Sequence, residues 1–344
     1  MNLNHQTKIW LVLISLWVIN GSSFLAIKVA IDTIPPILSA GLRFSIAGAI
    51  LFTIYFLQVN RPRLWEHHDP DHSQKIPDVG QNMRVQLKVP REKITLHQWK
   101  DSLILGVTLF LGGQGLLTWG AQYLSSGMTG LLNSTIPLWV AIIGYLLYRW
   151  FKKDSLGKKM SRGTMLGLIA GFGGLMLLVG PSIGSGDLDP IGTVALIISS
   201  ISWAIGSIYS TRAQLPVSIL ASAGMIMITG GLMLTGVSFI LGEYKDLDLM
   251  QISIQSIVAQ IYLIGIITVV GFTDFYWLLR VTSASLANTF AYVSPVIAVL
   301  LGVVVLHENI TLITVIAMVI ILAGVALMVT KKKAPSKSKQ IESS

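Results

Sequence analysis

Ten long apolar stretches fill almost the whole of this chain, and they restrict its fold more than any other feature. A hydrocarbon core about 30 Å thick requires roughly 20 apolar residues of helix. Stretches of about this length occupy Lys8–Ile31, Pro36–Gln58, Trp99–Tyr123, Met128–Tyr148, Gly163–Gly180, Pro190–Ser210, Ser218–Leu241, Ile257–Val281, Ser285–Leu306 and Ile310–Thr330. Membrane β-barrels show short alternating strands instead of such continuous runs. The sequence therefore predicts an all-α membrane protein with ten transmembrane helices.

The composition agrees with this class. Only 12% of the 344 residues are charged, whereas a soluble domain has about 25%. The chain contains no cysteine, which excludes disulfides and thiolate metal sites. We expect no cofactor and no bound metal.

The charges indicate how the chain is oriented. Of the 25 Lys and Arg residues, 22 lie on one side of the ten spans, together with both termini. Since cytoplasmic loops carry the excess of Lys and Arg, both termini are predicted to be cytoplasmic in a plasma membrane. The net charge of +9 is then a topology signal, and a nucleic-acid partner is disfavoured.

Two polar segments interrupt the pattern. Residues 59–98 form an enlarged cytoplasmic loop, and residues 331–344 form a basic tail that we expect to be disordered. The loop contains a run of acidic and His residues, Glu66 to His72. Its spacing matches no defined metal site, and its role stays open.

An internal repeat divides the chain into halves of residues 1–182 and 183–330. Ser125 precedes Pro137 by twelve residues, and Ser283 precedes Pro295 by the same interval, 158 residues further on. Trp17 and Trp203 occupy similar places in the first and sixth spans. Because each half has five spans, the second must enter the membrane from the opposite side. Inverted repeats are typical of secondary transporters, which bind substrate where the repeats meet.

Several segments together resemble the EamA-type members of the drug/metabolite transporter superfamily. These segments are Trp17–Lys28, Pro36–Phe44, Tyr123–Pro137, Ser202–Arg212 and Tyr276–Glu308. The resemblance covers everything except the 59–98 loop and the tail. It implies ten helices in two five-helix repeats and the export of amino acids or other small metabolites.

Polar and aromatic side chains near the middle of the spans are the candidate substrate-binding residues. The amides either bind substrate or form hydrogen bonds between helices, and the aromatic rings are suited to an apolar cavity. The set comprises Trp17, Asn20, Gln114, Trp119, Asn133, Trp203, Tyr276, Asn288 and Tyr292.

Ionisable groups inside a membrane are costly and are functional candidates. Asp274 lies within the eighth span, where it either exchanges a proton during transport or is a structural partner of Arg280. Arg43 in the second span either binds a carboxylate or holds helices together. Lys28, near the outer end of the first span, is expected to extend to the membrane interface.

Pro137 and Pro295 lie at equivalent places in the fourth and ninth spans. Proline removes a backbone hydrogen bond and bends a helix, so both residues are either hinges or passive kinks.

These observations predict a carrier that moves small organic metabolites across the plasma membrane by alternating access, with efflux favoured by the resemblance. The expected partners are a small-molecule substrate, the lipid bilayer and, if Asp274 exchanges protons, protons. The protein is a monomer or a homodimer. A membrane-embedded enzyme or a non-transporting scaffold or receptor is the alternative, but no catalytic motif supports an enzyme.

Overall fold

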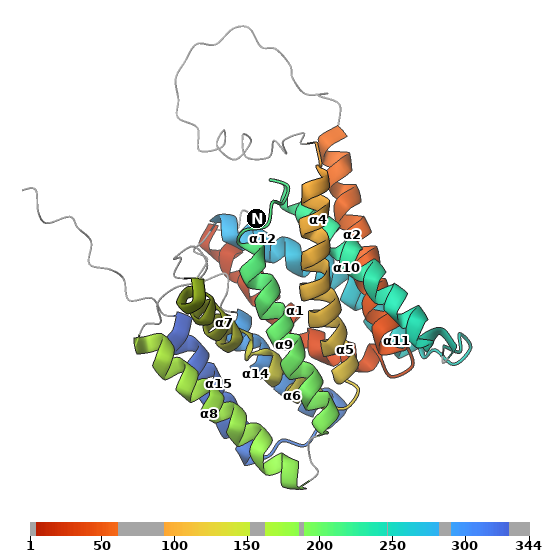
Figure 1. Ribbon diagram of the computed structural model, residues 1–344. Coiled ribbons are helices and arrows are strands. Elements are labelled where there is room, and N and C mark those ends of the chain that lie inside the picture. Colours follow the sequence, from red (N-terminus) through yellow and green to blue (C-terminus); the bar gives the residue numbers. More distant parts are fainter. Residues whose placement is uncertain are drawn as a thin grey trace, which may run out of the picture.

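The computed structural model describes residues 5–60, 93–151, 162–185, 189–245, 247–281 and 290–329. Throughout these ranges the regular structure is helical (Figure 1). Residues 61–92 of the enlarged loop, the basic tail and Asn288 lie outside the described residues, as do the side chains of Tyr276, Arg280 and Tyr292. Residues 59–60 and 96–98 of the predicted loop are helical.

The helices of the first half follow the predicted spans closely. They are α1 (His5–Ala30), α2 (Pro36–Asn60), α4 (Leu96–Leu105), η1 (Gly106–Gly115), α5 (Leu116–Gly120), α6 (Ser126–Asn133), α7 (Ile136–Phe151) and α8 (Arg162–Ser185). Here α4, η1 and α5 form one continuous span whose middle section, η1, is a π-helix.

The second half has the corresponding order. Its helices are α9 (Pro190–Ser210), α10 (Ile219–Leu241), the short η2 (Glu243–Lys245), α11 (Ile254–Tyr262), η3 (Leu263–Val270), α12 (Gly271–Val281), α14 (Phe290–Leu306) and α15 (Leu312–Val329). Again one span contains a π-helix, because α11, η3 and α12 are continuous and η3 is π-helical.

Seven helices of the described ranges are long and apolar enough to cross a membrane, and three further apolar helices are shorter. The shorter ones are Gly163–Leu177, Val293–Leu306 and Leu312–Gly324. Large apolar side chains are exposed along the outside of the bundle, such as Ile169, Ile240 and Val304. Such exposure is what a lipid environment favours.

Helices from the first half of the chain pack side by side with helices from the second half. In Figure 1, α8 and α15 lie together at one edge of the bundle, and α2 and α10 pair at another. In addition, α1 packs against η3, α12 and α14 of the second half, and α9 packs against η1, α5 and α6 of the first. The core is therefore shared between the halves.

Glycines allow the close approach of α2 and α10. A Cβ atom on Gly41 would lie 2.7 Å from the Thr235 nitrogen, and one on Gly48 would lie 2.8 Å from the Ile228 nitrogen. On the facing helix, Gly224 and Gly231 are as tightly packed against the backbone of α2. Small residues let transmembrane helices approach to van der Waals contact of their backbones, which explains why this pair is so extensive.

The charged side chain of Lys28 satisfies backbone carbonyl groups at the end of the bundle that is predicted to face outside. Lys28 donates hydrogen bonds to the carbonyl oxygens of Ala121, Gln122 and Leu124, at 2.8, 3.0 and 2.8 Å. These carbonyls lie just past the end of α5, where a cation is favoured by unpaired C=O groups. Lys28 therefore caps the end of this helix, and the expectation that it extends to the membrane interface stays a prediction.

Candidate functional site

The two π-helical segments occupy matching places in the two halves. Thr95 caps the N-terminus of α4 in a capping box with Gln98, and Ser253 caps α11 in the same way through its hydroxyl. The π-helix η1 begins eleven residues after its cap, and η3 begins ten residues after its own. Longer π-helices are rare, and π-type turns in helices are frequent at functional sites. The middle of the bundle, where η1 and η3 lie, is thus the first candidate region.

Hydroxyl groups of α9 stabilise the wide turns of η1. Ser199 Oγ donates to the Gly113 carbonyl oxygen at 2.7 Å, and Ser202 Oγ donates to that of Thr108 at 2.8 Å. A Cβ atom on Gly113 would approach Trp203 Cε3 to 2.9 Å, so glycine is needed for α9 to pack this closely. The sequence prediction treated this span as an ordinary α-helix and did not include the π-helix.

Arg43 belongs to α2, and its side chain contacts η3. Its Nε donates a hydrogen bond to Thr268 Oγ1 at 2.9 Å, and the Thr268 hydroxyl in turn donates to the Leu263 carbonyl oxygen at 2.8 Å. Its Cζ atom lies 4.7 Å from the centroid of the Phe44 ring. The side chain is 7% exposed. The structure therefore brings Arg43 to a π-helix, which agrees with the predicted helix-joining role.

A second polar contact lies one turn further out, between α2 and α11. Ser39 Oγ donates to Gln260 Oε1 at 2.7 Å, and Gln260 Nε2 donates to the Ser39 carbonyl oxygen at 2.8 Å. Both residues are buried. Polar side chains commonly join transmembrane helices in this way. The sequence prediction did not select Ser39, Gln260 or Thr268, because serine, threonine and glutamine at span positions have many roles.

Aromatic rings link Arg43 to one of the predicted pocket residues. The rings of Phe44 and Phe110 meet edge to face with centroids 4.6 Å apart, and Phe110 is 6.4 Å from Trp203. These residues come from α2, η1 and α9. Arg43 and Trp203, which were predicted separately, thus belong to one buried neighbourhood in which Phe44 and Phe110 are the unpredicted members.

The fourth span is discontinuous. Helix α6 ends at Asn133 and α7 begins at Ile136. At the break, the hydroxyls of Ser134 and Thr135 donate to the carbonyl oxygens of Leu131 and Leu132 at 2.6 and 2.7 Å, replacing helix hydrogen bonds. Broken helices are a common part of transporter binding sites.

This break changes the interpretation of the two prolines. Pro137 lies in the first turn of α7, where its missing N–H removes no helix hydrogen bond. The interruption at Ser134 and Thr135 lies directly before it, where a proline disfavours helical backbone, so the predicted bend at this position is compatible with the structure and its role as a hinge stays a prediction. Pro295 lies inside α14 as predicted.

Asn20 and Asn133 lie at a similar depth on neighbouring helices. A Cβ atom on Gly130 of α6 would lie 3.3 Å from Phe24 Cδ2 of α1. From that contact, Asn133 is three residues along α6 and Asn20 is four residues back along α1. At 1.5 Å per residue these offsets are about 4.5 and 6 Å. Asn20 Nδ2 donates to the Leu16 carbonyl oxygen at 3.0 Å within its own helix. The side chain of Asn133 is half-buried, with no acceptor or donor assigned to it among the described residues.

The other predicted residues are more dispersed. Gln114 is a half-buried residue of η1, and Trp119 packs edge to face on Tyr123 at 5.2 Å, near the end of α5. Trp17 packs on the cluster of Leu13, Leu16 and Leu278.

Asp274 belongs to α12, on the cytoplasmic side of η3 in the predicted topology. Its Oδ2 accepts a hydrogen bond from Ser15 Oγ at 3.2 Å, and the residue is half-buried. The contact joins α12 to α1. Asp274 and Arg43 therefore have different partners, and they form no pair with each other in the described structure.

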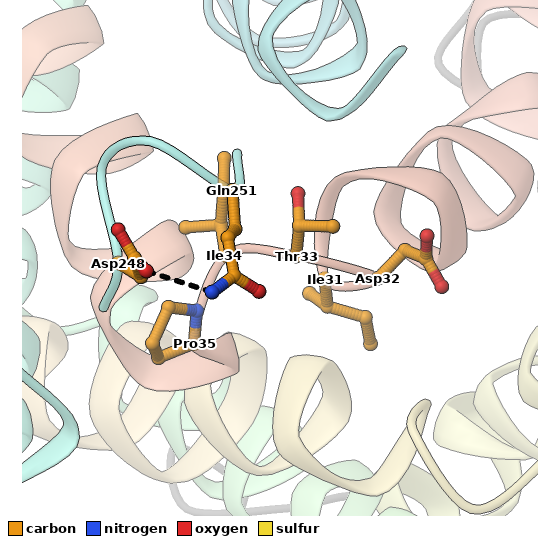
Figure 2. A pocket seen from close by; sticks show the side chains of 7 residues that line it. All are labelled: Ile31, Asp32, Thr33, Ile34, Pro35, Asp248 and Gln251. Atoms are coloured by element: carbon orange, nitrogen blue, oxygen red, sulfur yellow. Dashed lines mark hydrogen bonds between the residues drawn. The ribbon is translucent and has the colours of Figure 1, made fainter. Parts of the chain in front are cut away.

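A separate hollow of about 330 Å³ lies at the predicted outer end of the bundle (Figure 2). It is lined by Ile31–Pro35, between α1 and α2, and by Asp248 and Gln251 from the segment before α11. Figure 2 shows the hydrogen bond from Gln251 Nε2 to Asp248 Oδ2, which measures 2.7 Å. None of the predicted substrate-binding residues lines this hollow.

Comparison with known proteins identifies the class to which this fold and its buried polar centre belong. The model of the EamA-like transporter family matches residues 85–180 and 190–330. The chain therefore belongs to the EamA-like transporter family, and it is a multi-pass membrane protein.

Individual relatives extend the match to nearly the whole chain. The uncharacterized transporter YoaV of Bacillus subtilis (strain 168) is 27% identical over 93% of this chain and 96% of its own length. The uncharacterized inner membrane transporter YedA of Escherichia coli (strain K12) is 28% identical over 93% of this chain and 90% of its own length. One solved crystal structure covers 94% of this chain and 97% of its own, with a TM-score of 0.55 and 18% identity, which shows a shared fold alone.

Proposed function

We propose that this membrane transporter is a secondary carrier for small organic metabolites. Its ten membrane-crossing helices form two five-helix halves of opposite orientation, with both termini in the cytoplasm. Substrate binds where the halves meet, and alternating access moves it across the plasma membrane, preferentially outward. The two domains are residues 1–182 and 183–330.

One observation carries this proposal: helices that occupy the same position in the two halves pack against each other. Second spans pair as α2 with α10, fourth spans as α6 with α14, and fifth spans as α8 with α15. The caps Thr95 and Ser253 are separated by 158 residues, the same interval that separates Pro137 from Pro295. Pairing of this kind supports two halves related by an axis in the membrane plane, as in secondary transporters built from inverted repeats.

The buried centre between the halves supports a binding role. It combines two π-helices, a broken span and aromatic rings with a few polar groups, and small-molecule sites are typically apolar with a few placed polar side chains. Asn133 at the break and Trp203 beside η1 are the residues we place in direct contact with substrate. Pro295 serves as a hinge, and Asp274 as the proton-coupling group.

The test is transport by the purified protein in liposomes. Counterflow of radiolabelled amino acids and nucleosides should be faster than in empty liposomes, and overexpressing cells should export the same compounds. Trp203→Ala should reduce the rate at least several-fold, whereas Trp150→Ala should not, because Trp150 is 74% exposed at the end of α7. The absence of flux of any metabolite tested, with correctly folded protein, would contradict the proposal.

A further inference from the structure

We infer that Arg43 supplies the counter-charge for an anionic group, a carboxylate, on the transported molecule. This inference rests on the proposed transport function and adds the chemical class of the substrate. It also gives Arg43 the binding role that the sequence left as one of two alternatives.

The burial of Arg43 requires an explanation beyond helix packing. An arginine inside a membrane helix is costly, and such residues usually pair with an opposite charge or with backbone carbonyls. Arg43 is 7% exposed, yet its hydrogen-bond partner in the described part of the chain is the neutral hydroxyl of Thr268. No carboxylate of the described residues forms an ion pair with it.

The contacts in the described structure engage one edge of the guanidinium only. The Thr268 hydroxyl holds Nε, and the Phe44 ring lies 4.7 Å from Cζ, so the group is fixed by one nitrogen and one neighbouring ring. The four N–H groups on its two Nη atoms have no protein acceptor in the described structure. Two parallel N–H groups on the Nη atoms match the two oxygens of a carboxylate, which arginine binds in a bidentate manner.

The surroundings favour an organic acid over a bare inorganic ion. The ring of Phe44 contacts that of Phe110, which leads to Trp203 on α9. An apolar substituent attached to the carboxylate would pack against the half-buried ring of Trp203. Chloride or phosphate shares the charge but cannot use this surface.

The experiment uses matched probes on the full-length purified protein. Unfolding temperature and equilibrium binding are measured with 3-phenylpropionate, phenylalanine and leucine, with the amide of each, and with chloride and inorganic phosphate. We expect the carboxylates to raise the unfolding temperature and the amides to do so much less. Arg43→Gln should weaken carboxylate binding by about tenfold or more, which corresponds to about 1.4 kcal/mol.

Two further variants separate a binding role from a purely structural one. Arg43→Lys keeps the charge but not the fork, so it should retain part of the preference for carboxylate over amide. Thr268→Val keeps the whole guanidinium and removes only its acceptor, so it should retain carboxylate selectivity even if it is less stable. If Arg43→Gln does not fold, these two variants still test the inference. Carboxylate selectivity should fall when the guanidinium is replaced in Arg43→Lys, and it should be kept when only the Thr268 hydrogen bond is removed in Thr268→Val.

The outcomes distinguish this inference from the proposed function. The inference is overturned if no carboxylate in the panel stabilises the wild-type protein, if the amides bind as well as the acids, or if Arg43→Gln leaves carboxylate binding unchanged. It is also overturned if chloride and phosphate bind as tightly as the organic acids, since the site is then a simple anion site. If only neutral or cationic metabolites show counterflow, the inference about the carboxylate is overturned and the proposed transport function still holds.

Discussion

The carboxylate of Glu308, which follows α14, accepts a hydrogen bond from the backbone nitrogen of Ser126 at 2.6 Å, at the start of α6. The same carboxylate accepts from Ser126 Oγ and the Gly127 nitrogen at 3.0 and 3.3 Å. Glu243, which follows α10, accepts in a similar way from the nitrogens of Ile37 and Leu38 at the start of α2, at 3.1 and 2.8 Å. In both cases an acidic side chain past the end of one helix caps the N-terminus of the helix it pairs with. The negative charge suits the positive end of the helix dipole.

Replacing Glu308 by alanine should therefore destabilise the protein. Hydrogen bonds to charged groups contribute about 1.5–3 kcal/mol when buried, and Glu308 is half-buried, so we expect a loss of about 1 kcal/mol. The measurement is unfolding of the detergent-solubilised protein by heat. Lys8→Ala is the control, because Lys8 is exposed near the start of α1. Equal unfolding temperatures for the two variants would show that the cap contributes nothing.

The contact of α2 with α10 leads to a second prediction, on two glycines of one helix. A Cβ atom on Gly231 would collide with the backbone nitrogen of Ser45, whereas one on Gly236 meets nothing within 4 Å. Gly231→Ala should therefore separate the helices and cost about 1–3 kcal/mol. Gly236→Ala should stabilise slightly, by about 0.5–1 kcal/mol, since alanine is the better helix former. Thermal unfolding of both variants checks the direction in which each substitution shifts the unfolding temperature. Shifts in the same direction would contradict the close contact of Gly231 with α2.

A third prediction concerns the two prolines, which the sequence treats as equivalent and the structure does not. Pro295→Ala restores a backbone donor inside α14 and should raise the unfolding temperature, because an interior proline costs a helix about 3 kcal/mol. Pro137→Ala should have little effect, since its position in the first turn of α7 needs no donor. If Pro295 is a hinge, its variant should also transport more slowly in counterflow than the Pro137 variant. Equal stability effects would show that the two sites bend their helices alike.

The helices themselves were predictable because hydrocarbon thickness fixes the length of a span, so that a run such as Pro190–Ser210 coincides with α9. The break before Pro137 was predicted only as a bend, because proline disfavours helical backbone before it, and the sequence did not show that the hydroxyls of Ser134 and Thr135 take over helix hydrogen bonds there. The π-helices were missed for a similar reason. Both segments lie inside long apolar runs, in which the change from i→i−4 to i→i−5 hydrogen bonds leaves no mark on the composition.

The site was predicted in part. Arg43 was found from its charge inside a span, which is a strong signal because such charges are rare there. Thr268 and Phe110 were not found, because neither type of residue is unusual in a membrane helix. Their roles depend on which helices are neighbours, and the sequence pattern of one span does not contain that information.

A fourth prediction tests the orientation inferred from the positive charges. The chain has no cysteine, so single cysteines can be placed in the segments before and after α10 without removing any others. An impermeant maleimide applied to intact cells should label Leu249→Cys, after the outer end, and should label Thr211→Cys only after permeabilisation. Both positions are exposed. The reverse pattern would invert the predicted topology, and labelling of both in intact cells would contradict α10 as a membrane span.

The last prediction concerns Asp274, the acidic side chain that joins α12 to α1 through Ser15. If its carboxyl takes up and releases a proton during each cycle, Asp274→Asn should abolish uptake driven by an imposed pH gradient while leaving substrate exchange at equal pH intact. An amide cannot ionise but still accepts the Ser15 hydrogen bond, so the local packing is kept. Ser15→Ala is the matched control, because it removes the donor and keeps the carboxyl, and it should retain gradient-driven transport. An Asn variant that responds to the gradient like the wild type would show that the proton passes elsewhere, and Asp274 would then be a structural partner of α1.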